Sequence, residues 1–189
     1  MLRELVIQNR SCRRFAEGFA IERRTLEELV DLARLSASAA NLQPLKYILS
    51  CEPQRNAQIF RHVAWAAYLK DWAGPAEGER PSAYIIILGD TEISKTFGCD
   101  YGIAAQTILL GARERGLAGC MIGLIQRDAL RATLAIPARY EILLVLALGQ
   151  PREQVVIDDL GPEGDIRYWR DSRGVHHVPK RPLTELILG

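Results

Sequence analysis

The 189-residue sequence lacks a surplus of charge of either sign, because 24 lysines and arginines face 23 aspartates and glutamates. A protein that binds nucleic acid or an anionic membrane surface commonly carries a strong basic excess. The composition therefore favours neither partner. Any anion that the protein binds must be held by a local cluster of cationic side chains.

Long apolar runs are also missing. No stretch reaches the roughly 18 apolar residues of a membrane-spanning helix candidate. Residues 1–5, MLREL, show neither the basic stretch nor the apolar core with which a secretory leader begins. We therefore expect a cytoplasmic protein with no membrane partner.

Metal-binding patterns are absent as well. The four cysteines are far apart and form no C-x-x-C pair, which argues against zinc knuckles and iron–sulfur sites. The three histidines and the acidic residues Asp158, Asp159 and Asp171 do not cluster at ligand spacing, and they are typical of packing and turn positions. The sequence predicts no metal site.

The composition, with 48% hydrophobic and 25% charged residues, is that of an ordinary globular domain, so one domain over residues 1–189 is expected.

Apolar periodicity predicts helices over residues 25–38, 56–72, 100–116, 128–134 and 183–188. Strands are predicted over residues 46–51, 83–89, 120–123 and 141–149, with a hairpin over residues 166–178 and a surface loop over residues 73–82. Helices and strands are interspersed without strict β-α-β alternation. This favours the α+β class, with a mixed central sheet flanked by helices, over a doubly wound parallel sheet.

The first candidate site is a basic cluster, N-R-S-C-R-R-F, over residues 9–15. Guanidinium groups bind phosphate oxygens in bidentate fashion, and a serine hydroxyl adds a neutral donor. Arg10, Ser11 and Arg13 are therefore candidates for binding a phosphate. The alternative interpretation is a solvated basic turn between two helices.

The second candidate site is a string of small residues, S-A-S-A-A-N-L-Q-P, over residues 36–44. Small side chains let the backbone approach a flat ring closely, and the amides of Asn41 and Gln43 can both donate and accept hydrogen bonds. A helix end followed by an ordinary loop is the alternative interpretation.

In order and spacing, five motifs together resemble the nitroreductase family: R-S-C-R-R-F, S-A-S-A-A-N-L-Q-P, D-Y-G-I-A-A-Q-T-I-L-L-G-A, G-C-M-I-G and V-P-K-R-P-L. The resemblance covers essentially the whole chain. It implies a domain-intertwined α+β homodimer with two FMN molecules in clefts formed by both subunits. It also implies electron transfer from NAD(P)H, a transient donor, to small acceptors such as nitroaromatics or quinones.

The resemblance further implies the residues that contact FMN. From one subunit, the phosphate, ribityl chain and pyrimidine edge are contacted by Arg10, Ser11 and Arg13, with the phosphate site completed by Lys180 and Arg181. From the other subunit, the flavin is lined by Ala37, Ser38, Ala39, Asn41, Gln43 and Pro44. The backbone of Ile122, Gly123 and Leu124 is expected beside the isoalloxazine ring, where an amide could bind its N5.

Three positions depart from the family pattern. Asn9 stands where an arginine is usual, Leu45 where a bulky aromatic residue is usual, and Leu124 where a second glycine is usual. The lost arginine removes one charge-assisted contact from the phosphate site, worth about 1.5–3 kcal/mol. The two leucines bear on substrate shape.

The resemblance places the redox chemistry on the flavin N5, with hydride taken up and electrons passed on in ping-pong order. No protein nucleophile or general base is expected, and Arg13 is the candidate for stabilising negative charge on reduced flavin. Two alternatives stay open: a flavin-binding carrier or sensor without turnover, and a specialised reductive chemistry on the same fold.

Overall fold

The computed structural model describes residues 1–161 and 163–188 of the chain. Its helices are α1 (Leu2–Gln8), α2 (Arg23–Arg34), the 3-10 turn η1 (Ala39–Asn41), α3 (Pro53–Phe60), α4 (Asp100–Glu114), α5 (Arg127–Leu134) and α6 (Leu183–Leu186). Its strands are β1 (Leu45–Ser50), β2 (Ala83–Asp90), β3 (Ala118–Ile122), β4 (Tyr140–Gly149), β5 (Val155–Asp159), β6 (Trp169–Arg170) and β7 (His176–Lys180). None of the described helices is both long enough and apolar enough to cross a membrane.

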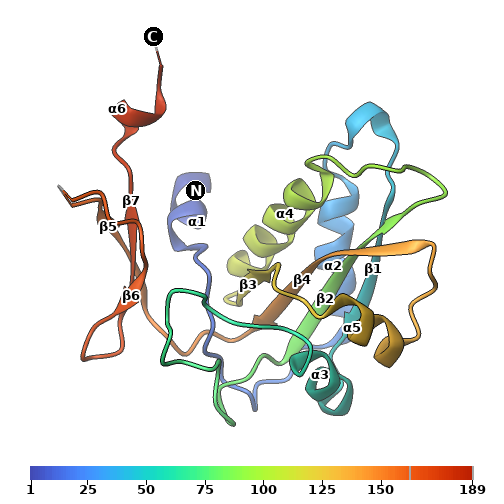
Figure 1. Ribbon diagram of the computed structural model, residues 1–189, viewed down its shortest axis with the longest axis horizontal. Helices are drawn as coiled ribbons and strands as arrows, with labels where there is room; N and C mark the ends of the chain where they lie inside the picture. Colours follow the sequence, from blue (N-terminus) through green and yellow to red (C-terminus); the bar gives the residue numbers. More distant parts are fainter. Residues whose placement is uncertain (162, 189) are drawn as a thin grey trace.

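The strands form two sheets, which lie apart in Figure 1. The larger has the order β1-β2-β4-β3, and each of its neighbouring pairs is antiparallel. The smaller has the order β5-β7-β6, with β5 parallel and β6 antiparallel to β7. The predicted α+β class is confirmed. Mixed strand pairing, which was expected in the central sheet, lies in the smaller one.

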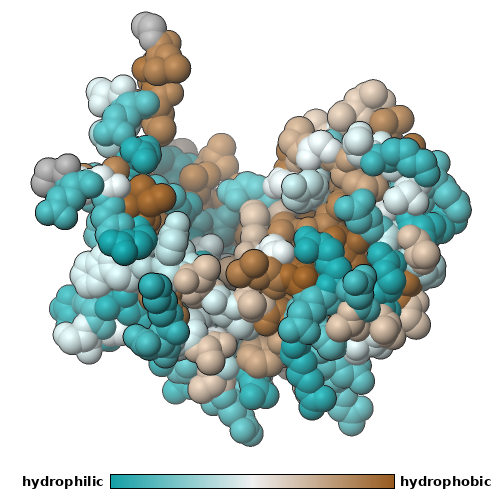
Figure 2. Space-filling model, viewed as in Figure 1, coloured by the Kyte–Doolittle hydropathy of each residue, from teal (hydrophilic) through white to brown (hydrophobic). Residues whose placement is uncertain are grey.

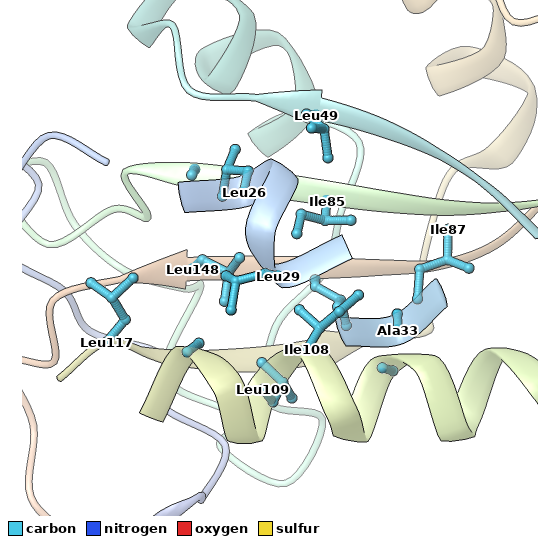
Figure 3. Packing of buried hydrophobic residues seen from close by; sticks show 14 of the residues in the cluster. Leu26, Leu29, Ala33, Leu49, Ile85, Ile87, Ile108, Leu109, Leu117 and Leu148 are labelled. Atoms are coloured by element: carbon cyan, nitrogen blue, oxygen red, sulfur yellow. The ribbon is translucent and has the colours of Figure 1, made fainter. Parts of the chain in front are cut away.

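Helices cover both faces of the larger sheet. All eight residues of β2 are buried, so its side chains contribute to the hydrophobic core on both faces of the sheet. Ile85 and Ile87 pack with α2 and α4, and Figure 3 shows Leu29 of α2 and Ile108 of α4 in the same cluster. The alternate residues of β2 pack on the other face with Ile59 of α3 and Leu130 of α5.

A β-bulge in β4 sets which side chains face which core. Ile87 pairs with Leu144 but the next residue, Leu88, pairs with Ile142, so Leu143 is an extra residue on β4. One extra residue moves the following side chains to the opposite face. For this reason Leu144 contacts the core under α2 and α4, whereas Ile142 belongs to the core under α3 and α5.

The predicted helix over residues 56–72 is wrong in its second half. The helix begins at Pro53 and ends at Phe60. Proline is favourable in the first helical turn because an N–H at that position would have no partner within the helix, so no hydrogen bond is lost. Residues 61–82 form turns and loops, with Ala66 at a φ of 41°. Trp65 is 8% exposed and lies 6.0 Å from the Phe60 ring, so these apolar residues cover the core without a helix.

Other boundaries differ less. The helix predicted to end near residue 38 ends at Arg34, because the following small residues form η1. The predicted hairpin is confirmed by the pairing of β6 with β7. Strand β5, which carries the acidic residues Asp158 and Asp159, was not predicted.

Candidate functional site

The basic cluster is anchored to the β3 edge of the larger sheet. Ser11 forms a parallel bridge with Gly119, and the Cys12 backbone N–H donates to the Gly119 carbonyl at 3.0 Å. Phe15 is fully buried. It packs so closely on Gly149 that a Cβ added to this glycine would lie 2.7 Å from the Phe15 ring. The cluster is therefore a fixed segment at a sheet edge.

Arg13 is held in place by the C-terminal hairpin. Its guanidinium lies 4.8 Å from the centre of the Tyr168 ring, and its Nη1 lies 3.3 Å from Nε2 of His176. The Arg13 backbone N–H donates to the Glu153 carboxylate. Glu153 is itself buried and bonded to Arg170 at 2.8 Å. These contacts fix the position of one positive charge.

His176 is neutral beside this charge. Burial, followed by the positive charges of Arg13 and Arg170, lowers the pKa of His176 to about 4. Arginine has only N–H donors, so the Nε2 atom of His176 accepts from Arg13 and its Nδ1 carries the proton. The pair is therefore an arginine bonded to a neutral imidazole.

Arg10 and Arg14 differ in their free hydrogen-bonding capacity. Arg14 makes two bonds to Glu79, at 2.8 and 2.5 Å. Arg10 donates to the Val6 carbonyl at 2.9 Å, but its buried Nε has no partner among the residues that the structure describes. Burial lowers the pKa of Arg10. Arg10 thus retains an unsatisfied donor that an anion could bind.

Arg10 also lines a cleft of about 530 Å³ with two further arginines, Arg113 and Arg152. Arg113 donates to the Gln8 side chain at 3.1 and 3.2 Å, and Arg152 donates to a backbone carbonyl at 3.3 Å. No motif in the sequence predicts a site role for these two residues. Arg113 is separated from Gln8 by 105 positions, so no local motif could have joined them.

Lys180 and Arg181 lie at the end of the C-terminal hairpin and are exposed. Arg181 bonds to Glu185 at 3.1 Å, and the Lys180 carbonyl accepts from the Leu160 N–H at 2.9 Å. Within the described part of the chain neither side chain is hydrogen-bonded to Arg10 or Arg13. Arg10, Ser11 and Arg13 lie in one fixed segment, and no hydrogen bond between described residues joins the terminal pair to them.

The small-residue segment is held by a single buried carboxylate, Asp100, in the first turn of α4. Asp100 accepts a bond of 2.6 Å from the Ser38 hydroxyl and one of 3.1 Å from the Ala39 N–H. The Gln43 N–H in turn donates to the Ser38 hydroxyl at 2.9 Å. Between these bonds the backbone turns sharply, with Ala40 and Asn41 at φ values of 48° and 54°.

This segment borders a cavity of about 170 Å³ lined by Ala37, Ser38 and Gln43 together with Leu45, Tyr47 and Asp100. Burial and the charge of Asp100 raise the pKa of Tyr47 to about 12, so its hydroxyl stays protonated at neutral pH. Ala39 and Asn41 are exposed beside it, whereas Pro44 is buried and its carbonyl accepts from the Asp90 N–H at 2.8 Å. The predicted residues of this segment are thus close together in space.

Ile122, Gly123 and Leu124 lie where β3 ends. Ile122 is buried and pairs with Val145, whereas Gly123 is exposed and Leu124 is 58% exposed. Ile122 is the last residue of the edge strand to which Ser11 is bridged, and Gly123 and Leu124 follow it directly. The basic cluster and residues 122–124 therefore form one set, which we call the β3-edge set.

The small-residue segment forms a second set at the other edge of the same sheet, because it leads directly into β1. Strands β1 and β3 are separated by two strands in the order β1-β2-β4-β3, or about 14 Å at the usual strand spacing. One copy of the chain therefore presents two half-sites that do not meet. Among the described residues, no three histidine, cysteine or acidic side chains are grouped so that they could hold a metal ion.

Comparisons with known proteins agree with this architecture. A putative NADH dehydrogenase/NAD(P)H nitroreductase of Archaeoglobus fulgidus is 26% identical over 159 residues, covering 80% of this chain and 86% of that protein. An FMN-dependent nitroreductase of Clostridium difficile R20291 is similar in structure, with a TM-score of 0.64, 21% identity and coverage of 79% and 87%. A nitroreductase family protein of Streptococcus pneumoniae TIGR4 has a TM-score of 0.71 at 15% identity, with both chains fully covered.

The model of the nitroreductase family matches residues 6–150, which include the basic cluster, the small-residue segment and all of the larger sheet. The chain therefore belongs to the nitroreductase family, and it is an oxidoreductase.

Proposed function

We propose that the chain is an FMN-dependent oxidoreductase that takes electrons from NADH or NADPH and passes them, in ping-pong order, to small acceptors such as nitroaromatics or quinones. The observation that carries this proposal is the pair of half-sites at opposite edges of one sheet, each held by a carboxylate side chain that is itself buried. The name of the Archaeoglobus relative and the FMN-dependent structural neighbour support the donor and the cofactor.

The residues present fit an FMN group. The unsatisfied Nε of Arg10 and the exposed Ser11 supply donors for a phosphate. The exposed Lys180 would add to them, and so would Arg181 once it exchanges its bond to Glu185 for one to the phosphate. When bound, FMN would accept hydride at N5 and pass electrons to the acceptor. Arg13, fixed by Tyr168 and His176, would hold a positive charge at the pyrimidine edge and stabilise negative charge there.

A second copy of the chain would supply the other wall. Its small residues Ala37, Ser38 and Ala39 would let the backbone approach the ring, and the amides of Asn41 and Gln43 would bind polar groups of the ring edge. Pro44 would shape this segment, while Ile122 and Gly123 would come from the β3-edge set. No protein side chain acts as nucleophile in this scheme.

The visible spectrum of the purified protein, followed by anaerobic titration with NADH and NADPH, tests the proposal. We expect a yellow protein whose flavin absorbance is bleached by at least one nicotinamide and restored by a nitroaromatic or a quinone. A colourless protein that does not bind added FMN at micromolar concentration would contradict flavin binding. A yellow protein that neither nicotinamide bleaches would instead identify a carrier or sensor.

We further propose a homodimer, because the two half-sites of one copy lie at opposite sheet edges. Figure 2 shows a hollow between the C-terminal sheet and the body that carries α2 and α4. Beyond β7, Leu183, Leu186 and Ile187 are 62–69% exposed, an apolar surface that a second copy would bury. We expect light scattering to give twice the 21.1 kDa chain mass for the FMN-bound protein. An FMN-saturated monomer would contradict the dimer.

A further inference from the structure

A cavity of about 290 Å³ lies apart from both half-sites, between α3, the start of β2 and residues 17–20. None of the predicted cofactor-binding residues lines it. It lies on the α3 side of the larger sheet, because Tyr84 in its wall packs into the core under α3 and α5. In Figure 1, α3 lies on the side of the strands opposite to α2 and α4. The cavity is therefore separate from the proposed flavin site.

Its wall contains an unpaired buried hydroxyl. Tyr84 is 1% exposed, and its hydroxyl has no hydrogen-bond partner within residues 1–161 and 163–188. Burial raises the pKa of Tyr84, so the hydroxyl is protonated and can donate. A buried hydroxyl without a partner is costly, and such groups are usually satisfied by water or a ligand.

Arg80 adds an unpaired cation to the same wall. Its guanidinium lies 4.7 Å from the centre of the Phe60 ring, and its buried Nε has no partner among the described residues. The acidic residue that lines the cavity, Glu17, uses one carboxylate oxygen to accept the backbone N–H groups of Gly78 at 2.5 Å and Arg80 at 3.4 Å. The Arg80 side chain is therefore free to bind an anion.

The other polar side chains in the wall are already occupied. The Asn56 amide donates to the Ser82 carbonyl and accepts from the Ser50 hydroxyl, both at 2.7 Å. The remaining surface is apolar and includes Phe60, Ala57 and Pro81. A ligand that fits this wall has a flat apolar body and one anionic group with acceptor oxygens.

We propose that this cavity binds a small aromatic carboxylate, with its carboxylate on Arg80 and Tyr84 and its ring against Phe60 and Pro81. Carboxylates match the planar donor fork of arginine and also accept from a hydroxyl. An aromatic ring matches the apolar part of the wall, which includes Phe60, Ala57 and Pro81. The proposal does not depend on the oxidoreductase activity, because it concerns a separate cavity.

The test uses the FMN-saturated protein, 4-fluorobenzoate as the probe and ¹⁹F NMR as the readout, with the flavin absorbance recorded in parallel. We expect saturable binding that leaves the flavin spectrum unchanged. Benzoate should compete with the probe, whereas the neutral benzyl alcohol should compete poorly. Absence of binding, or binding that always perturbs the flavin spectrum, would overturn the proposal.

Three variants locate the site. Arg80→Met keeps an unbranched apolar stem, removes the guanidinium and should weaken binding about tenfold or more, the effect of losing a charge-assisted hydrogen bond. Tyr84→Phe removes only the hydroxyl and should weaken binding by roughly two- to tenfold. The matched control is Arg61→Met, which removes an exposed charge just beyond α3 and outside the cavity lining. Unchanged affinity in the folded Arg80 and Tyr84 variants, or an equal loss in the Arg61 variant, would contradict the assignment.

Discussion

Replacing Asp100 with alanine is expected to release the small-residue segment and to weaken FMN binding at least tenfold. The carboxylate is 4% exposed and accepts bonds from Ser38 and Ala39, and Ser38 in turn holds Gln43. Its loss removes two hydrogen bonds to a carboxylate, one from the half-buried Ser38 and one from the exposed Ala39, at about 1.5–3 kcal/mol of unfolding free energy. Without these bonds, Ala40 and Asn41 are held at positive φ, a conformation that is unfavourable for residues with a side chain, mainly by the local backbone bonds of η1. Chemical denaturation and FMN titration measure the two effects.

The matched control for this variant is Asp128→Ala. Asp128 occupies the first turn of α5, as Asp100 occupies that of α4, but it is exposed. Both substitutions remove a negative charge that favours a helix N-terminus, an effect of about 0.3–1 kcal/mol. Only the Asp100 variant should lose additional stability and FMN affinity. Equal behaviour of the two variants, or wild-type FMN affinity in the Asp100 variant, would contradict the role given to this carboxylate.

Asp100 also illustrates what the sequence can and cannot predict about the site. The small residues of 36–44 could be identified as a segment suited to a flat ring, because their composition is local. The residue that holds them lies 62 positions away from Ser38. A single sequence carries no signal for such a pairing, because it is created when α4 packs beside the end of α2. The same is true of Arg113 and Arg152 beside Arg10.

The elements that were predicted well are those whose residues are largely buried in the hydrophobic core. Strand β2 is buried along its whole length, and helix α4 is buried on the face that carries Ala104, Ile108 and Ala112, so their apolar composition indicates them. The helix predicted over residues 56–72 is wrong in its second half because apolar residues such as Trp65 are buried there from a loop, so their spacing resembles that of a helix. The bulge at Leu143 changes which face of β4 the side chains occupy, and no turn residue marks it in the sequence.

Replacing Arg10 and Arg13 together with alanine is expected to lower FMN affinity by about a hundredfold or more, because each guanidinium is proposed to make a charge-assisted bond worth about 1.5–3 kcal/mol. The fold of the apoprotein should survive, since the cluster remains anchored by Phe15 and by the Cys12 backbone bond to Gly119. FMN retention on gel filtration and far-ultraviolet circular dichroism measure the two properties.

The control must remove two arginines without touching the β3-edge set. Arg23→Ala with Arg24→Ala serves this purpose, because both side chains are exposed on α2 and, among residues 1–161 and 163–188, form ion pairs only with Glu27 and Glu28 at i,i+4 spacing. Such pairs contribute about 0.3–0.5 kcal/mol, so this variant should bind FMN as the wild type does. If FMN retention were unchanged in the Arg10 and Arg13 variant, the cluster would be ordinary surface. If both variants lost FMN equally, the effect would come from net charge, and the fixed position of Arg13 beside Tyr168 and His176 would have no part in binding.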